Sequence, residues 1–369
     1  MRRDFWEAIG MKYALIGCGR ISSNHIMSAI NNNLEMTAFV DIVRENAEDK
    51  IIKFDLQDKN IRIYEDYIEM LDREKPELVA IATESGKHAK IALDCIAVGC
   101  HVIIEKPMAL SIADADAIIE AGKKRGVIVC VNHQNRFNKS IIEIRKALER
   151  NRFGKLLYGT AHIRWARDHE YYDRASWRGT WAQDGGALMN QCIHDIDLLR
   201  WMMGDEVDTV FGMTDRLMHP YIEAEDMGIA VVKFKNGAYG VIEGTTDVYP
   251  KNLEETLYIF GEKGTVKAGG ESVNIIEEWR FSDYFGDEER VKKECSENPP
   301  NIYGFGHTKL YKNVIAAIQG KEKLVVDGEA GKRALELVLA IYKSAAEGRP
   351  VKLPLGNVST MDFSGRFDA

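Results

Sequence analysis

The chain has 369 residues, of which 45% are hydrophobic and 29% are charged. This length is too great for one ordinary hydrophobic core, so the first expectation is a globular protein of two domains. With 57 acidic and 49 basic residues the net charge is −8, which argues against nucleic acid or an anionic membrane surface as the main partner.

The termini and the cysteines point to the same class of protein. No apolar run is long enough to span a bilayer, and the opening MRRDFWEAIG has no apolar stretch typical of a secretory signal. We interpret the ten residues before Met11 as an extension or a misassigned start. The six cysteines have no paired spacing, so we expect reduced, mostly buried thiols, a cytoplasmic location and no metal site.

The first motif combines a strand, a glycine turn and a helix. The apolar run 12–16 is followed by Gly17-Cys18-Gly19-Arg20-Ile21-Ser22 and a helix-like stretch to about residue 30. In such a turn the first glycine permits the tight bend and the second lets the backbone approach a pyrophosphate, which the helix N-terminus then binds. Ser22, at the third glycine position, is small enough for close packing of helix on strand.

A carboxylate at the expected distance strengthens this interpretation. The next strand, 36–40, ends in Asp41, about twenty residues after the turn. A carboxylate there accepts hydrogen bonds from a ribose and repels a 2′-phosphate, which favours NAD. Arg44, three residues on, keeps NADP as the alternative.

The alternation of strands and helices continues. Strands are predicted at 78–82, 100–104 and 127–131, with helices at 88–98 and 112–124, which indicates a parallel sheet with ligands at the carboxyl ends of its strands. Thr83, Ser85 and His88 follow one strand end. They either line the nicotinamide side of a cofactor site or form an ordinary helix entry.

Glu105-Lys106-Pro107 ends another of these strands. Proline stops the strand and holds the residue before it extended, so Lys106 is expected at the mouth of the cofactor crevice. The alternative is a surface lysine whose stem covers apolar neighbours.

The pattern changes in the second half of the chain. After a helix at about 139–151, strand-like stretches dominate, and Lys235-Asn236-Gly237 is typical of a hairpin turn. Strands are predicted at 155–167, 207–214, 227–234, 238–245, 255–260 and 273–280. Two final helices are predicted at 302–319 and 329–346. We expect an open, mostly antiparallel sheet with one face on helices. Its other face needs covering, which predicts a homodimer or homotetramer.

The fold class is therefore α/β and α+β, with a Rossmann domain at 1–132 and an α+β substrate-binding domain at 133–369. A loop at 166–183 carries arginines and aromatic residues that suit sugar, base and phosphate recognition, among them Trp177 and Arg178. A packed subunit interface is the alternative for this loop. Arg136, after a strand of the first domain, is the better single candidate for an anionic group.

The stretch 184–204 reads as a helix. Met189, Ile193, Ile196 and Met203 form an apolar stripe, and beside it Asn190 lies one turn from His194. Asp184 is expected to cap the start of this helix and Gly204 to end it. Taken alone, this helix favours a packed core histidine with a satisfied hydrogen bond at position 194, and the rest of the chain changes that interpretation.

The glycine turn, the Glu105-Lys106-Pro107 triplet and the Gly-Gly-Ala…His194 helix together resemble the glucose–fructose oxidoreductase/inositol dehydrogenase/rhizopine catabolism (Gfo/Idh/MocA) family, from Met11 to about Pro354. The resemblance implies that Lys106 and His194 are catalytic. Many family members carry an aspartate where this chain has Asn190. That departure, and the run from Asn132 to Asn138, are similar to the branch that oxidises UDP-N-acetylglucosaminuronate at C3.

These observations predict hydride transfer from a sugar carbon to NAD, with His194 as general base, Lys106 stabilising the developing charge on oxygen, and Asn190 orienting the substrate or His194. The alternatives are a free sugar or cyclitol dehydrogenase, an NAD-using glycosidase and a non-catalytic NAD sensor. The expected cofactor-binding residues are Gly17, Gly19, Arg20, Ile21, Asp41, Thr83, Ser85, His88, Glu105 and Lys106. The expected substrate-binding residues are Arg136, Asn138, Trp177, Arg178, Asn190 and His194.

Overall fold

The computed structural model describes residues 10–283, 286–297 and 305–368, so most of the expected N-terminal extension lies outside the described residues. The chain divides into two compact units. Unit 1 contains the chain up to Glu105, then Asp116–Asn132 and His307–Gly328. Unit 2 contains Lys106–Ala115, His133–Gly306 and the chain from Glu329. The sequence analysis expects a single domain boundary at residue 132. That boundary would assign 106–115 to the first domain and 307–328 to the second, whereas the contacts place 106–115 in unit 2 and 307–328 in unit 1.

Unit 1 is built on a six-stranded sheet in the order β3-β2-β1-β4-β5-β6, with every neighbouring pair parallel. Its strands are β1 Lys12–Ile16, β2 Glu35–Val40, β3 Arg62–Tyr64, β4 Leu78–Ile81, β5 His101–Ile104 and β6 Val129–Val131. Every residue of β4 is buried, as expected of a parallel strand covered on both faces. This strand order is the doubly wound one, and it confirms the predicted Rossmann domain.

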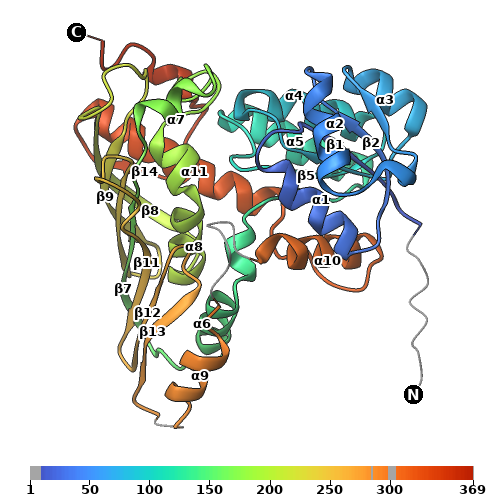
Figure 1. The fold of residues 1–369 in the computed structure, drawn as a ribbon. Helices are drawn as coiled ribbons and strands as arrows, with labels where there is room; N and C mark the ends of the chain where they lie inside the picture. Colours follow the sequence, from blue (N-terminus) through green and yellow to red (C-terminus); the bar gives the residue numbers. More distant parts are fainter. Residues whose placement is uncertain (1–9, 284–285, 298–304, 369) are drawn as a thin grey trace, which may run out of the picture. The chain divides into compact units, whose positions relative to one another are not determined.

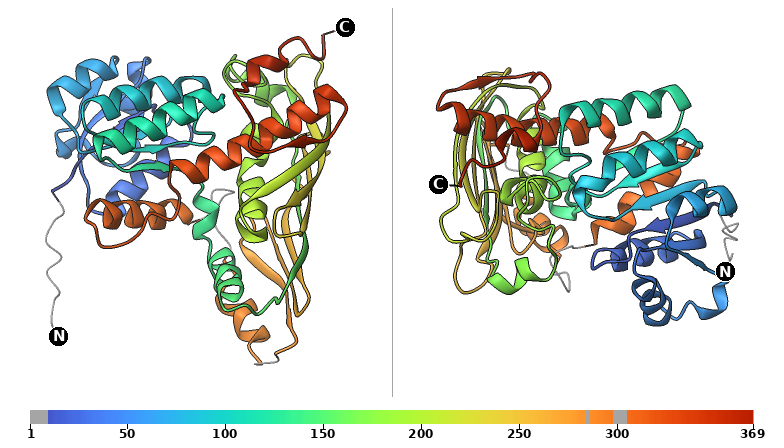
Figure 2. Two further views of the ribbon diagram at one scale, coloured as in Figure 1. Left: turned by 180° about the vertical axis from the view of Figure 1, so that it is seen from behind. Right: turned by 90° about the horizontal axis from the view of Figure 1, so that it is seen from above.

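Helices connect these strands and cover the sheet (Figures 1 and 2). They are α1 Ser22–Asn31, α2 Arg44–Lys53, α3 Tyr67–Glu74, α4 His88–Ala97 and α5 Ile112–Arg125, with short turns η1 Gln57–Lys59 and η2 Ser85–Lys87. The strand order reverses between β1 and β4, where ligands of such sheets bind. Helix α10, Gly306–Ile318, also packs on this unit, since the hydroxyl groups of Tyr13 and Tyr311 lie 3.0 Å apart. The first residues of the helix expected at 302–319 lie outside the described residues.

Unit 2 contains an eight-stranded sheet in the order β13-β12-β11-β7-β10-β9-β8-β14. Its strands are β7 Leu156–Arg164, β8 Val207–Asp215, β9 Met227–Phe234, β10 Tyr239–Thr245, β11 Glu254–Gly261, β12 Gly264–Gly269, β13 Ile275–Phe281 and β14 Val351–Lys352. The β7–β10 pair is parallel and the other pairs are antiparallel, which confirms the predicted mostly antiparallel sheet. The hairpin at 235–237 joins β9 and β10, and Gly237 has the positive φ of +88° that the turn requires.

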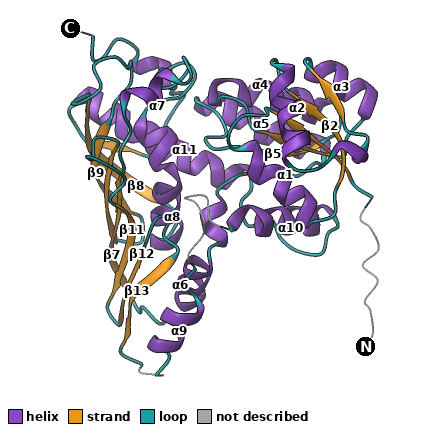
Figure 3. Ribbon diagram, in the orientation of Figure 1, coloured by secondary structure: helices purple, strands orange, loops and turns teal. Residues whose placement is uncertain are grey.

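Helices of unit 2 lie on one face of this sheet (Figure 3). They are α6 Lys139–Glu149, α7 His169–Asp173, α8 Ile193–Met203, α9 Glu288–Glu294 and α11 Gly328–Glu347, with short segments η3 Gln134–Phe137, η4 Leu188–Cys192 and η5 Thr360–Phe363. Side chains alternate between buried and exposed along β9, so the opposite face is open in this single chain. That face carries Phe211, Met213, Ile229 and Val231, all at least 42% exposed.

Two further expectations concern the cysteines and membrane-spanning helices. All six cysteines are free thiols, and every one except Cys295 is buried, as predicted. None of the helices in the described part of the chain is both long and apolar enough to cross a bilayer.

Candidate active site

The glycine turn of unit 1 has the geometry expected of a dinucleotide site. Gly17 has φ +94°, and a Cβ there would lie 2.5 Å from the carbonyl oxygen of Ala82, so only glycine fits. A Cβ at Gly19 would meet nothing within 4 Å, which leaves that edge of the turn open to a ligand. Arg20 is exposed at this edge, followed by the half-buried Ile21 and the N-terminus of α1. The turn therefore fits a pyrophosphate.

Asp41 holds the turn from the neighbouring strand. One carboxylate oxygen accepts the backbone N–H of Cys18 at 2.8 Å. The other accepts the N–H of Val43 at 2.9 Å and the side chain of Asn46 at 3.1 Å. The carboxylate thus sits at the carboxyl end of β2 beside the glycine turn, as the ribose-binding prediction requires.

The residues after β4 form a tight helix entry. Ser85 is buried in η2, and Nε2 of His88 lies 3.1 Å from the carbonyl oxygen of Thr83. These contacts favour the helix-entry interpretation of His88. A nicotinamide-side role for Thr83 and Ser85 stays a prediction.

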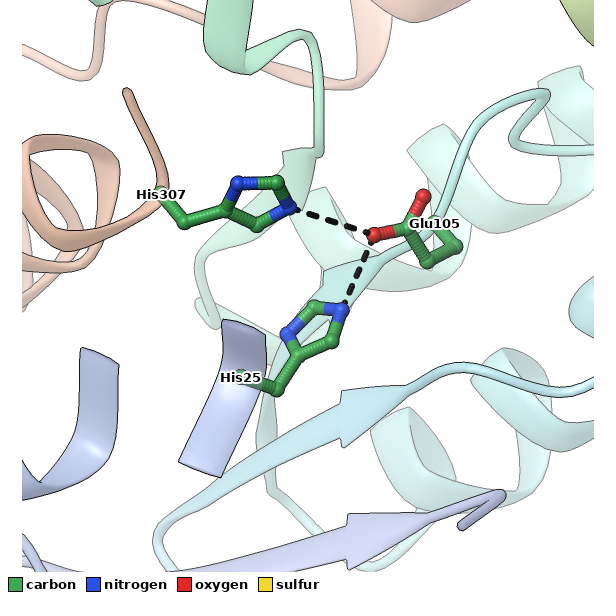
Figure 4. Close-up of side chains that lie close together, drawn as sticks. All are labelled: His25, Glu105 and His307. Carbon is green, nitrogen blue, oxygen red and sulfur yellow. Dashed lines mark hydrogen bonds and ion pairs between the residues drawn. The ribbon is translucent and has the colours of Figure 1, made fainter. Parts of the chain in front are cut away.

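Glu105 extends into the interior of unit 1 (Figure 4). Its Oε1 accepts a hydrogen bond from the side chain of Asn132 and lies 2.9 Å from Nε2 of His25 and 3.9 Å from Nε2 of His307. Nδ1 of His25 in turn lies 2.7 Å from the hydroxyl of Tyr311. Burial alone would raise the pKa of Glu105, but the two histidines hold it well below its usual range. Oε1 of Glu105 is therefore held inside this network, and a cofactor contact by Glu105 stays a prediction.

Lys106 and Asn190 meet in unit 2. Nζ of Lys106 donates to the backbone carbonyl of Asn190 at 2.6 Å and lies 3.4 Å from its side-chain oxygen. Asn190 stands four residues before His194. The structure therefore brings the three predicted catalytic residues to one end of α8.

The helix that carries them begins differently from the prediction. Gly185 and Gly186 both have positive φ, and the helix starts with a π-helical turn, η4, before α8. The predicted N-cap role of Asp184 is wrong, because its carboxylate accepts the N–H of Gly179 at 2.7 Å and the side chain of Asn190 instead. The predicted end at Gly204 is confirmed, since it follows α8 with φ +120°.

His194 is largely buried, with 9% of its surface exposed. Its Nε2 lies 3.4 Å from Nε2 of Gln134, and its ring meets His133 edge to face with centroids 5.6 Å apart. Burial lowers the pKa of His133 to about 4, so that ring is neutral at neutral pH. His194 thus lies beside two neutral polar side chains, those of His133 and Gln134. The sequence carried no signal that these residues would lie next to His194.

Arg136 has a partner that the sequence did not suggest. Its guanidinium makes two bonds of 2.7 Å to Asp197 and stacks on Trp201 with 4.5 Å between guanidinium carbon and ring centroid. The group is 3% exposed. Asn138 donates to the carbonyl of Ser272 at 2.8 Å and is equally buried. Both side chains hold unit 2 together here, so their substrate role has no geometric support and stays a prediction.

The loop between β7 and η4 stacks arginines on aromatic rings. The guanidinium carbons of Arg167 and Arg178 lie 4.9 and 4.1 Å from the ring centroid of Tyr171, and Arg178 is 5.5 Å from that of Trp177. Arg167 also donates to Gln191 at 2.6 Å. The loop therefore presents two cations next to the residue that follows Asn190, an arrangement able to receive an anionic substrate group.

Sequence reasoning missed the support beneath the Gly185–Gly186 turn. Glu225 accepts the N–H of Leu188 at 2.7 Å and the hydroxyl of Tyr342 at 2.8 Å. A Cβ at Gly186 would lie 1.7 Å from Oε2 of Glu225. The paired glycines were the only sequence signal for such a close approach, and they do not name the partner.

Among the described residues, two groups of side chains each offer three possible metal-binding atoms within 4.8 Å of one another. One is His25 with Glu105 and His307, and the other is His219 with Asp226 and Asp247. Burial would lower the pKa of His219, but hydrogen bonds to both aspartates raise it to about 9. Nδ1 of His219 lies 3.1 Å from Asp226, and Nε2 lies 2.8 Å from the carbonyl oxygen of Arg167, so both ring nitrogens have protein partners. We interpret the His219 group as an ion-pair cluster, and the absence of a metal stays a prediction.

A Rossmann unit with an open glycine turn, together with a lysine–asparagine–histidine group, defines a nucleotide-dependent oxidoreductase. Family models agree: residues 11–133 match "Oxidoreductase family, NAD-binding Rossmann fold", and residues 145–353 match "Oxidoreductase family, C-terminal alpha/beta domain". The chain belongs to the Gfo/Idh/MocA family of NAD-binding oxidoreductases, as its motifs predict.

Individual relatives differ in their substrates. The chain is 38% identical to the WlbA dehydrogenase of Bordetella pertussis, solved with NADH and UDP-GlcNAcA, over 94% of this chain and 99% of that one, with a TM-score of 0.88. The same enzyme from Chromobacterium violaceum, also with NADH and UDP-GlcNAcA, is 36% identical over 94% and 97%, with a TM-score of 0.85. Myo-inositol 2-dehydrogenase of Thermotoga maritima is 30% identical over 93% of this chain and 98% of its own length.

Proposed function

We propose that the chain is an NAD-dependent dehydrogenase that oxidises the C3 alcohol of UDP-N-acetylglucosaminuronate to a ketone. The observation that carries the chemistry is the contact of Lys106 with Asn190, one turn before His194. The likeness to two WlbA structures that hold NADH and UDP-GlcNAcA supports the substrate. The loop arginines stacked on Tyr171 suit a ligand with a carboxylate and a diphosphate.

The proposed reaction divides the alcohol's two hydrogens. The C–H hydrogen leaves as hydride to the nicotinamide ring, which is the chemistry that NAD supplies. The hydroxyl proton passes to His194, whose ring is buried beside the neutral side chains of His133 and Gln134. Lys106 donates to the same oxygen as negative charge develops on it. Asn190 orients the ammonium group of Lys106 through its carbonyl and side-chain oxygens.

One rival function has a specific observation behind it. The Thermotoga maritima relative is named for oxidation of myo-inositol, and a cyclitol needs the same hydride and proton transfers. The two functions differ in whether the binding wall must hold anionic groups. The further alternatives, an NAD-using glycosidase and a non-catalytic NAD sensor, release no NADH.

A substrate panel tests the proposal. The protein is mixed with NAD and, separately, UDP-N-acetylglucosaminuronate, UDP-N-acetylglucosamine, myo-inositol or glucose, and NADH is followed by absorbance. We expect NADH from the uronate and much less from UDP-N-acetylglucosamine, which lacks the C6 carboxylate. Faster turnover of myo-inositol would establish the rival. No NADH from any alcohol, with NAD bound, would refute the dehydrogenase assignment.

We further propose that the chain acts as a homodimer or homotetramer through the open face of the unit 2 sheet. On adjacent strands, Phe211 pairs with Val231 and Met213 with Ile229, so four exposed apolar side chains form one patch. Monomeric proteins rarely expose such a patch. A cytoplasmic location remains part of the proposal.

A further inference from the structure

Asp184 has a place that the proposed chemistry does not yet use. Its carboxyl group is buried, with 4% of the residue exposed, between two donors. One oxygen accepts the N–H of Gly179 at 2.7 Å, and the other accepts the side-chain amide of Asn190. The opposite end of that amide, its oxygen, lies 3.4 Å from Nζ of Lys106 and 3.1 Å from Nε2 of Gln191.

This arrangement fixes which way the Asn190 amide points. An amide has one donor end and one acceptor end, and a carboxylate only accepts. Asp184 therefore holds the NH₂ group toward itself and leaves the oxygen for Lys106. If the Asn190 amide turned over, its NH₂ group would face the ammonium group of Lys106. An ammonium group cannot accept a hydrogen bond, so the contact would be lost. Asp184 and Lys106 also interact through their charges, since the positive charge of Lys106 opposes the rise in the pKa of Asp184 that burial causes.

We propose that Asp184 is a positioning residue of the reaction: it orients the Asn190 amide toward Lys106 and supplies the negative charge that balances the lysine. The inference rests on the proposed function, since it assumes that Lys106 contacts the reacting oxygen. Burial raises the pKa of Asp184 to about 6, so the carboxylate is charged at neutral pH.

Exchanging the two groups tests this role. In Asp184→Asn, the oxygen of the new amide must accept the N–H of Gly179, so the NH₂ group of the new amide faces the NH₂ group of Asn190. Two donors cannot bond each other, so the Asn190 amide should turn over and present its NH₂ group to Lys106. In Asn190→Asp, two carboxylates face each other. In the double variant, the new amide at position 184 accepts from Gly179 and donates to the new carboxylate at position 190, which faces Lys106. Each single change should lower kcat at least about 10-fold with the KM for NAD unchanged, and the double variant should return to within roughly 5-fold of wild type.

A second variant and a control keep the test independent of folding defects. Asn190→Ala keeps Asp184, its bond to Gly179 and the backbone carbonyl that accepts from Lys106. It removes only the side-chain link between Asp184 and Lys106, so kcat should fall as it does in Asp184→Asn. Asp173→Asn changes an acid of the same loop whose side chain is 65% exposed, and it should leave kcat unchanged. Wild-type kcat in Asn190→Ala, or a double variant no better than the product of the single ones, would overturn the inference.

A measurement without substrate separates this inference from the proposed function. Competitive acetylation of Lys106, read by mass spectrometry across pH, reports the proton on its ammonium group. Asp184→Asn should move the midpoint of labelling to lower pH, because a balancing negative charge is lost. The other titratable groups that interact with Lys106 include His133 and Glu255, and the substitution leaves both in place. An unmoved midpoint would refute the role of Asp184 even in an active dehydrogenase, whereas a moved midpoint without turnover would refute only the proposed reaction.

Discussion

Replacing Glu225 by glutamine should change how the stability of the protein depends on pH. Glu225 is completely buried beneath the Gly185–Gly186 turn, and its Oε1 accepts from Leu188 and Tyr342. Among the described residues, none donates to its Oε2. Burial raises the pKa of this carboxyl group from 4.5 to about 8, so at neutral pH it is protonated in the folded protein.

The size of the effect follows from the two pKa values. The unfolded chain loses the proton near pH 4.5 and the folded protein keeps it to about pH 8. Stability from this group is therefore fully present below pH 4.5 and falls as pH rises, by about 1.4 kcal/mol per pH unit. The loss reaches about 3 kcal/mol at pH 7 and about 5 kcal/mol above pH 8. Glutamine has the shape of the protonated acid and does not titrate, so the variant lacks this loss.

The loss of stability caused by Glu225 can be measured by thermal unfolding of wild type and Glu225→Gln between pH 5 and 9. The difference in Tm should grow with pH in favour of the variant, by roughly 2–4 °C for each kcal/mol in a domain of 150–250 residues. Glu223→Gln, an exposed change two residues away, should follow the wild-type curve. Parallel Tm curves for wild type and Glu225→Gln would show that Glu225 is ionised in the folded protein and would refute the reasoning.

Four more changes test separate parts of the structure. His194→Ala should lower kcat by about 10²–10⁴ without weakening NAD binding, measured by steady-state kinetics and fluorescence titration. Gly186→Ala should reduce soluble yield and Tm, because the new Cβ would overlap the Glu225 carboxylate at a φ of +98°. Asp41→Asn should weaken NAD binding roughly 10-fold and reduce the preference for NAD over NADP, which titration of the protein with each cofactor would check. Ile229→Lys should dissociate the oligomer in light scattering; an unchanged mass would place the interface elsewhere.

Much of the fold could be predicted because its strands are strongly patterned. The run 12–16 and the glycine turn gave β1 and the start of α1, and β9 lies where its alternation predicts. Three strands were not predicted, for physical reasons. β3 has three residues, Arg62–Tyr64, and β14 has two, Val351–Lys352, too few for a period to show. β12, Gly264–Gly269, begins and ends in glycine, a residue that disfavours strands.

The candidate site divides in the same way. Lys106, Asn190 and His194 could be found because motif and helical spacing mark them. An arginine near a strand end suits an anion, which is why the sequence favours Arg136 as a substrate ligand. Its observed partner, Asp197, lies 61 residues away in the chain. Only folding reveals which of the chain's many carboxylates reaches a buried guanidinium, and the sequence carries no local sign of it.

The buried carboxyl groups around α8 separate into two kinds by the direction of their pKa shifts. Asp197 is paired with arginines, which hold its pKa far below the usual range, so it stabilises the folded unit. Burial instead raises the pKa of Asp184, Asp195 and Glu255, to about 6 for both aspartates. Asp195 and Glu255 also interact with each other, and neither oxygen of Asp195 meets another side-chain donor in the described part of the chain. Buried acids weaken a fold, and both Asp184 and Glu255 interact with the charge of Lys106, which suits a site that needs their charge or their proton.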